Sequence, residues 1–363
     1  MRLHNRIFTL IASALIVSAP LSAQTRVIKT TAMKSNDYGV QYYLPKTTLK
    51  VDISYSKVTQ QAGQYARYAE KLLGLSEANV VQEDLTYYTL NAISVEGIGI
   101  PDRDASYLVE FKAKSTAPFV YLTEEGLICA INAEYKPAST KAENASQTAQ
   151  AENGIDSQTL FTEEYLQAGS ASKMAEVLAK QIYRIRESRN DILLGDADNA
   201  PRDGEGMRIV LSNLDAQEKA LMEHFTGTSL TQKEHASFEI EPQTNINKEV
   251  LCRFSKYAGV VDSDDLSGTP VYINVTALEP TTPPAAALDP KRKDKEGQSI
   301  VYNIPVKSAV DVFYGTQKMC SEEILIAQFG EKQILSTSLF EDKKAPIQLI
   351  FYPNTGAIKS ITQ

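Results

Sequence analysis

Two stretches with helical periodicity lie in the middle of the chain, between residues 169 and 227. In each, apolar side chains recur every three or four residues, which places them on one face of a helix. Ser170 or Ser172 can cap the first helix, Gly195 is placed to end it, and Gly227 ends the second. The turn-rich link GDADNAPRDGEG between them predicts an antiparallel helical hairpin. The apolar positions are Ala171, Met174, Ala175, Leu178, Ile182 and Ile185, then Met207, Val210, Leu211, Leu214, Leu221 and Phe225.

Alternating apolar and polar residues mark the segments on either side of this hairpin. Val51, Ile53 and Tyr55 alternate with polar residues, and two apolar runs surround a Glu-Gly turn within residues 117–131. One short helix is predicted in each arm, at 64–75 and at 249–260. We therefore expect an α+β protein, with mainly antiparallel, sandwich-like β arms flanking a central antiparallel helical hairpin. The predicted strands cover residues 42–57, 85–93, 107–112, 117–131, 237–242 and 271–278.

The two arms carry similar sequence marks in the same order. These marks are YYLP at 42–45 with YNIP at 302–305, VDISY at 51–55 with VDVFY at 310–314, and APFVYLTEEGLICAI at 117–131 with APIQLIFYPNTGAIKSI at 345–361. A duplicated antiparallel β unit explains them, and so does the similar composition of any two strand–turn–strand segments. A shorter likeness between YARYAEKLLGL and LCRFSKYAGVV points to duplication as well.

The N-terminus has the features of a secretory signal peptide. A basic start at Arg2 and Arg6 precedes an apolar run and a small-residue site ending at Ala23. A membrane anchor is less favoured, because a span needs about 20 apolar residues. Removal of residues 1–23 changes the net charge from −8 to −10, because two arginines and no acids are lost. We expect an exported protein, periplasmic or associated with the outer membrane, without a transmembrane span. Its acidic charge argues against nucleic-acid binding.

Composition predicts the further organisation of the chain. Residues 136–158 are small and polar and cannot bury enough surface to offset ordering entropy, which predicts a flexible insert. The cations of the Pro- and charge-rich loop near 279–299 (Lys291, Arg292, Lys293 and Lys295) are largely offset by Asp289, Asp294 and Glu296, so a solvated loop is favoured over a binding site. The predicted units are 1–23 signal peptide, 24–135 N-terminal β-rich domain with a short helix, 136–158 insert, 159–229 helical hairpin and 230–363 C-terminal β-rich domain.

Cysteine and histidine offer few candidates for chemistry. The three cysteines, Cys129, Cys252 and Cys320, are far apart and odd in number, which favours small buried residues, although one pair can form after export. A reactive thiol would need an activating base nearby. His224 and His235 belong to no HExxH or paired-cysteine pattern, and no GxSxG elbow is present. No catalytic residue, cofactor or metal site is predicted.

Acidic turns and tyrosines are the remaining candidates. Asp196, Asp198 and Asp203, and also Asp262, Asp264 and Asp265, form clusters that could bind calcium, but turn-forming aspartates are the favoured interpretation. Pro201 stands where an EF-hand loop needs glycine. Five strand tyrosines could line a sugar or peptide groove, or pack at the edge of a β core. They are Tyr42, Tyr43, Tyr87, Tyr88 and Tyr121.

Several motifs together resemble a family of secreted Bacteroidales proteins that carries a domain-of-unknown-function label. They are DYGVQYYLPKT, PFVYLTEEGLICAINAE, HFTGTSL, RFSKYAGVVDSDDLSGTPVYI, IAQFG and PNTGAIKSI, and they span nearly the whole mature chain. The resemblance implies export and lineage, and it brings no catalytic residues with it.

Two functions from different classes remain open. The first is a non-enzymatic binding or scaffold protein of the bacterial cell envelope, with an envelope protein or a glycan as partner. The second is a secreted hydrolase that acts on glycan or peptide through carboxylates. Glycoside cleavage needs two carboxylates at a defined separation, which no motif in this sequence fixes.

Overall fold

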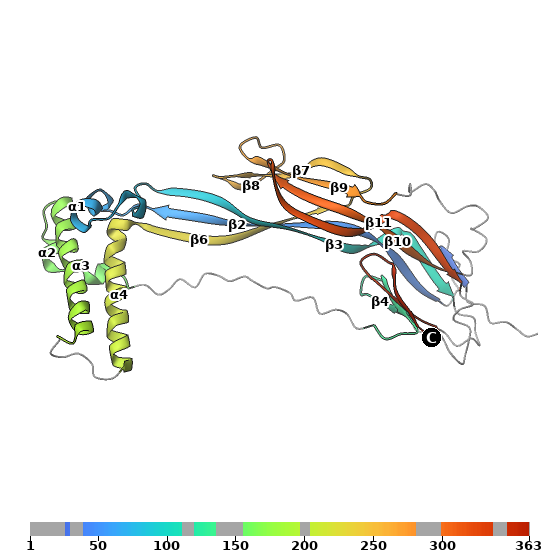
Figure 1. Ribbon diagram of the computed structural model, residues 1–363, viewed down its shortest axis with the longest axis horizontal. Coiled ribbons are helices and arrows are strands. Elements are labelled where there is room, and N and C mark those ends of the chain that lie inside the picture. The colour runs from blue at the N-terminus through green and yellow to red at the C-terminus, as the bar shows by residue number, and fades with distance from the viewer. Residues whose placement is uncertain are drawn as a thin grey trace, which may run out of the picture.

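The computed structural model describes residues 26–29, 39–110, 120–135, 155–196, 204–280, 299–336 and 347–362. Over these ranges the molecule is elongated, with its helices gathered at one end and its sheets forming the rest (Figure 1). Two long strands, β2 (Gly39–Gln61) and β3 (Leu85–Glu110), form one antiparallel ladder that runs between the helical end and the sheets. This strand hairpin connects the helical end with the sheets at the other end of the molecule.

The other elements follow in chain order. The strands are β1 (Arg26–Lys29), β4 (Val120–Leu122), β5 (Ile128–Ile131), β6 (Thr228–Ile240), β7 (Ile246–Ser255), β8 (Gly259–Val261), β9 (Thr269–Ala277), β10 (Ser299–Tyr314), β11 (Gln317–Ser336), β12 (Gln348–Phe351) and β13 (Ile358–Thr362). The α-helices are α1 (Ala69–Leu73), α2 (Glu163–Leu166), α3 (Ala171–Leu194) and α4 (Gly204–Thr226), with 3-10 turns η1 (Ala66–Tyr68), η2 (Glu77–Asn79) and η3 (Ser157–Leu160). Antiparallel pairing joins the strands into a first sheet β1-β3-β2-β6, a second β11-β10-β9-β7-β8 and a third β13-β12-β5-β4. The predicted α+β, mainly antiparallel class is confirmed.

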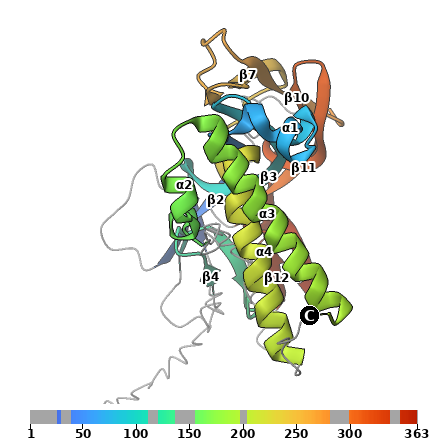
Figure 2. The ribbon, with the colours of Figure 1, turned by 90° about the vertical axis from the view of Figure 1, so that its left-hand side faces the viewer.

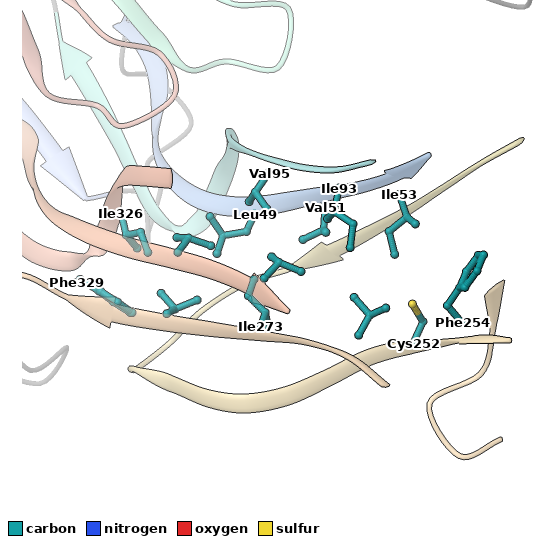
Figure 3. Close-up of a cluster of buried hydrophobic side chains, with 14 of the residues drawn as sticks. Leu49, Val51, Ile53, Ile93, Val95, Cys252, Phe254, Ile273, Ile326 and Phe329 are labelled. Atoms are coloured by element: carbon teal, nitrogen blue, oxygen red, sulfur yellow. The ribbon is translucent and has the colours of Figure 1, made fainter. Parts of the chain in front are cut away.

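The first and second sheets pack face to face around the central hydrophobic core. Every second residue of β2 from Leu49 to Ile53 is buried, because successive side chains of a strand point to opposite faces. Figure 3 shows these side chains of the first sheet directed toward those of the second, among them Cys252, Phe254 and Ile273. The arrangement is a sandwich over this part of the molecule.

The third sheet covers the opposite end of the long strand hairpin. It joins the small hairpin β4–β5 to the hairpin β12–β13, through pairing of Leu349 with Ile131. Its side chains pack with Tyr42 and Tyr107 of the first sheet and with Val301 of β10. Strands from before and after the helices therefore share sheets. The domain boundaries given above remain a prediction.

The helical hairpin forms as the sequence predicts. Ser170 is the cap of α3, since its Oγ accepts a hydrogen bond from the backbone N–H of Lys173 at 3.3 Å. Gly195 ends α3 with a φ of 84°, and α4 ends just before Gly227. The two helices lie side by side at the end of the molecule (Figures 1 and 2). The hairpin is thus central in the sequence and terminal in space.

Only the base of this hairpin has a closed core. There α1, η1, α2 and both long helices surround residues such as Tyr65, Leu178 and Phe225. From Arg186 to Leu194 of α3, and over residues 204–219 of α4, no side chain is buried. Ion pairs of Arg186 and Arg189 with Glu218 join the two helices in this projecting half.

The helix predicted at residues 249–260 is wrong. This segment forms most of β7, a turn and the start of β8, and β7 pairs with β9. Its buried residues Cys252 and Phe254 are two apart, so a strand period of two outweighs its helix-forming composition. In addition, the strand predicted at 85–93 and the described part of the strand predicted at 107–112 belong to one strand, because β3 runs from Leu85 to Glu110.

The repeated marks of the two arms occupy matching positions. YYLP and YNIP both lie at a shift of strand register, where Leu44 and Pro305 have no partner across the ladder. In both, a backbone N–H donates to the carbonyl of a turn glycine: Tyr43 to Gly126 at 2.9 Å and Asn303 to Gly356 at 3.1 Å. These shared contacts favour duplication over similar composition. The shorter likeness does not extend this match, because YARYAEKLLGL contains a helix and LCRFSKYAGVV forms strands.

Candidate functional site

A cluster of aromatic side chains and one lysine lies where the β7–β8 turn meets β3. Nζ of Lys256 is 5.9 Å from the ring centre of Tyr87 and 5.7 Å from that of Tyr257. Tyr257 is 67% exposed, and Lys256 is exposed as well. A lysine that contacts two ring faces at once is favoured by the ring quadrupoles. We call Tyr87, Lys256 and Tyr257 the aromatic–lysine cluster.

The backbone beneath this cluster is held in place. The N–H of Tyr88 donates to the carbonyl of Lys256 at 2.7 Å, which joins the turn to β3. Gly259 has a φ of 75° and packs on the ring of Tyr88, where a Cβ would lie 3.0 Å from a ring carbon. Tyr88, Tyr55 and Phe254 form a chain of ring contacts leading into the sandwich core. The exposed side chains therefore stand on a rigid base.

The five tyrosines proposed as groove residues do not come together. Tyr87 and Tyr88 lie at the aromatic–lysine cluster, but Tyr42 is fully buried in the core under the third sheet. Tyr43 bonds to the β4–β5 turn, and Tyr121 is an exposed residue of β4. A single groove lined by all five is thus not formed: Tyr42 packs inside the β core, and Tyr43 is half-buried beside the β4–β5 turn.

The structure brings two carboxylates together around one lysine. Nζ of Lys46 lies 3.1 Å from Oε1 of Glu241 and 3.9 Å from Oδ1 of Asp102. The hydrogen bond that Lys46 donates to Glu241 raises the pKa of Lys46 above its ordinary value, with Asp102 adding a smaller effect. The three side chains form an ion-pair cluster that joins β2, β3 and the segment after β6.

His224 is the histidine that the fold encloses. Its ring packs near Phe161 at 5.5 Å and Tyr65 at 6.3 Å, and its Nε2 is buried with no hydrogen-bond partner in the described residues. Burial lowers its pKa, with a smaller opposing effect from Glu223. His235 is exposed on β6, far along the ladder. The two histidines do not form a joint site.

The acidic turns act as local hydrogen-bond acceptors where they are described. Asp265 accepts from the N–H of Ser267 at 2.9 Å, and this bond lowers the pKa of its carboxyl group. Asp264 accepts from the hydroxyl of Ser263. Asp198 and Asp203 lie outside the described residues. Within the described ranges, no group of three or more His, Cys, Asp or Glu side chains is arranged to hold a metal ion.

All three cysteines are free thiols in the structure. Burial raises the pKa of Cys129 and of Cys252 to about 11 each, so neither ionises near neutral pH. Cys320 is half-buried, and its pKa is raised mainly by burial as well. These environments are those of packing residues.

Sequence reasoning missed Lys256 and Tyr257 as site residues. Both lay within the segment predicted as a helix, which separated them from Tyr87. The signal that could have placed them is the spacing of Cys252 and Phe254, followed by the turn residue Gly259. The ion-pair cluster of Lys46, Asp102 and Glu241 was missed for another reason: it joins residues up to 195 positions apart.

The fold defines an elongated α+β protein built from antiparallel sheets with a terminal helical hairpin. Within the ranges described, none of the helices is both long and apolar enough to cross a membrane. Residues 38–359 match the family described as a domain of unknown function, DUF4831, and the chain belongs to this family. Comparisons with curated proteins and with solved structures give no match. The predicted signal peptide and nearly all of the insert and of the Pro- and charge-rich loop lie outside the described residues.

Proposed function

We propose that this protein is an exported, non-enzymatic binding or scaffold protein of the cell envelope in Bacteroidales. The observation that carries the proposal is the spacing of its three hydrophobic cores along one strand hairpin. β2 contributes Tyr42 to the core under the third sheet and Leu49 to the sandwich core, and it then leads to Tyr65 in the helical core. Such an architecture holds two ends apart.

The two ends offer different surfaces. The helical hairpin presents Leu193, Leu194 and Ile209 to solvent near its tip, whereas the third sheet presents Tyr352 and Ile361. Exposed apolar side chains at the extremities of a molecule favour contact with partners there. An envelope protein or a glycan is the partner class that fits an exported protein.

The alternative of a carboxylate hydrolase gains no support from the ion-pair cluster. Asp102 and Glu241 are both engaged in ion pairs with Lys46. Glycoside hydrolysis needs two carboxylates that flank the scissile bond at a defined separation. We therefore retain the scaffold or binding role alone.

Photo-crosslinking in intact cells tests this function. A crosslinking residue is placed at Leu194 in the hairpin or at Ile361 in the third sheet, with Leu230 on β6, an edge strand of the first sheet, as a matched exposed control. We expect a recurrent envelope component to be captured from at least one end and not from Leu230. Capture of nothing from either end, by protein that is exported and folded, would remove the proposal. N-terminal sequencing of the exported protein, expected to begin at Gln24, tests the signal peptide.

A further inference from the structure

We propose that the aromatic–lysine cluster of Tyr87, Lys256 and Tyr257 binds an oligosaccharide that carries carboxylate groups. This names a ligand class for the binding role proposed above and rests on that role. The site is formed by β3 and the β7–β8 turn, because Nζ of Lys256 lies over the rings of both Tyr87 and Tyr257. Lys256 and Tyr257 follow Tyr87 by 169 and 170 positions in the sequence.

The charge of Lys256 is available for a ligand. Within the described part of the chain Lys256 has no carboxylate at ion-pair distance, whereas Lys46, Lys50 and Lys318 each have at least one. Its contacts are instead the faces of two tyrosine rings. Cation–π contacts at exposed sites are worth about 0.5–1 kcal/mol and leave the N–H groups of the ammonium free to donate. A carboxylate on the ligand would accept charge-assisted hydrogen bonds from them.

The two rings supply the apolar part of the site. Tyr257 is the most exposed tyrosine of the described residues, at 67%, and Tyr87 is half-buried beside it. A tyrosine offers an apolar face and a hydroxyl group that can hydrogen-bond, which matches a sugar ring with its C–H faces and hydroxyl groups. Two rings around one cation therefore suit a saccharide with an acidic group better than a purely apolar ligand.

The site needs little reorganisation to bind. Tyr88 fixes the carbonyl of Lys256 at 2.7 Å, and the hydroxyl of Ser255 accepts a hydrogen bond from the N–H of Tyr257 at 3.3 Å. A backbone fixed before binding lowers the entropic cost of association. The single cation and the chain's net charge of −8 favour a ligand with separated acidic groups over a densely charged polyanion.

Fluorescence of an introduced tryptophan tests the site in the full exported chain. The protein contains no tryptophan, so Tyr257→Trp places one reporter in the cluster. Tyr352→Trp is the matched control, because Tyr352 is 46% exposed and has one lysine, Lys359, over its ring at 5.7 Å. Short uronic-acid oligosaccharides of several linkages are titrated into both variants, together with neutral oligosaccharides of the same length.

We expect a saturable fluorescence change at position 257 with at least one acidic oligosaccharide and none at position 352. Adding Lys256→Met should weaken this binding about tenfold or more, whereas Lys256→Arg should retain it. No response to any acidic oligosaccharide, or an equal response to the neutral ones, would overturn the proposal. Circular dichroism of each variant establishes that it is folded. If the titrations fail while crosslinking still captures a partner, the scaffold role stands and this site is excluded.

Discussion

The side-chain hydroxyl of Tyr42 forms hydrogen bonds with both backbone groups of Val301, as a neighbouring strand would. It accepts a hydrogen bond from the N–H of Val301 at 3.0 Å, and it lies 3.2 Å from the carbonyl oxygen of Val301, to which it donates. Both residues are fully buried, and 259 positions separate them. Burial raises the pKa of Tyr42 far above its ordinary value, so the hydroxyl stays protonated and able to donate. One side chain thereby satisfies both backbone groups at the meeting of the first and second sheets.

Tyr42→Phe should therefore destabilise the protein by about 2 kcal/mol or more. The substitution leaves the N–H and the carbonyl of Val301 buried without this partner, and an unsatisfied buried polar group costs about 1–3 kcal/mol. Urea denaturation measures the change in the free energy of unfolding. Tyr302→Phe is the control, because among the described residues its hydroxyl bonds only to the half-exposed Gln333, at 3.1 Å, and a loss below about 1 kcal/mol is expected. Equal effects of the two substitutions would contradict this role of Tyr42.

Gly330→Ala should prevent close approach of β11 to β10. A Cβ at Gly330 would lie 1.7 Å from the carbonyl oxygen of Ile304, which is a backbone atom and cannot move aside without displacing the strand. We expect a loss of about 3 kcal/mol in stability, or failure to fold. Gly169→Ala has open space around its Cβ and should leave the unfolding midpoint unchanged. A fully stable Gly330→Ala variant would contradict the observed β10–β11 contact.

The stability of the helical end should fall as the solution becomes acidic, because of His224. Burial lowers its pKa in the folded state, so the unfolded chain binds this proton more readily than the folded chain. The stabilisation is present above the unfolded-state pKa of about 6.5 and is lost as the pH falls below it. Between about pH 7.5 and about pH 5, the free energy of unfolding measured in urea should fall less for His224→Leu than for the wild type.

His235→Leu serves as the control for this pH dependence. His235 is exposed on β6. For His235→Leu, the free energy of unfolding should therefore fall between the two pH values by as much as it does in the wild type. If His224→Leu and the wild type lose the same stability on acidification, another group causes the effect.

Glu218 should make the main polar contact between α3 and α4 in the projecting half of the hairpin. Its carboxylate accepts from Nε of Arg186 at 2.6 Å and from a terminal nitrogen of Arg189 at 2.8 Å, and it is the least exposed partner of these pairs. Glu218→Gln should increase amide hydrogen exchange in this half, with a local loss of about 1 kcal/mol. Glu187→Gln, on an exposed face of α3, should leave exchange unchanged. Unaltered exchange in Glu218→Gln would contradict this role of Glu218 in joining the two helices.

Local patterns in the sequence predicted the hairpin and several strands well. Ser170, Gly195 and Gly227 mark helix ends through rules of capping and backbone conformation that need no tertiary context. The segment around Cys252 was predicted wrongly because its short apolar run fits helix and strand alike, and pairing with β9 decides between them. Pairing with β2 likewise makes β3 one continuous strand where the sequence predicted two.

The candidate site was less predictable, since it depends on contacts between distant segments. Tyr87 was recognised as a possible ligand-contacting residue, yet nothing local relates it to Lys256 or Tyr257. The same holds for Tyr42, which was considered as a groove residue although its hydroxyl serves Val301 in the core. In both cases strand register determines the outcome, and register follows from the whole sheet.

We infer that β2 and β3 hold the helical hairpin at a fixed distance from the third sheet. Double electron–electron resonance between spin labels at Leu194→Cys and Ile361→Cys measures this distance, with Cys320 replaced by serine and the buried Cys129 and Cys252 retained. We expect one narrow distance distribution, unchanged when the protein concentration is varied. A broad distribution, or several separate distances, would contradict the role of the strand hairpin as a spacer between the two ends.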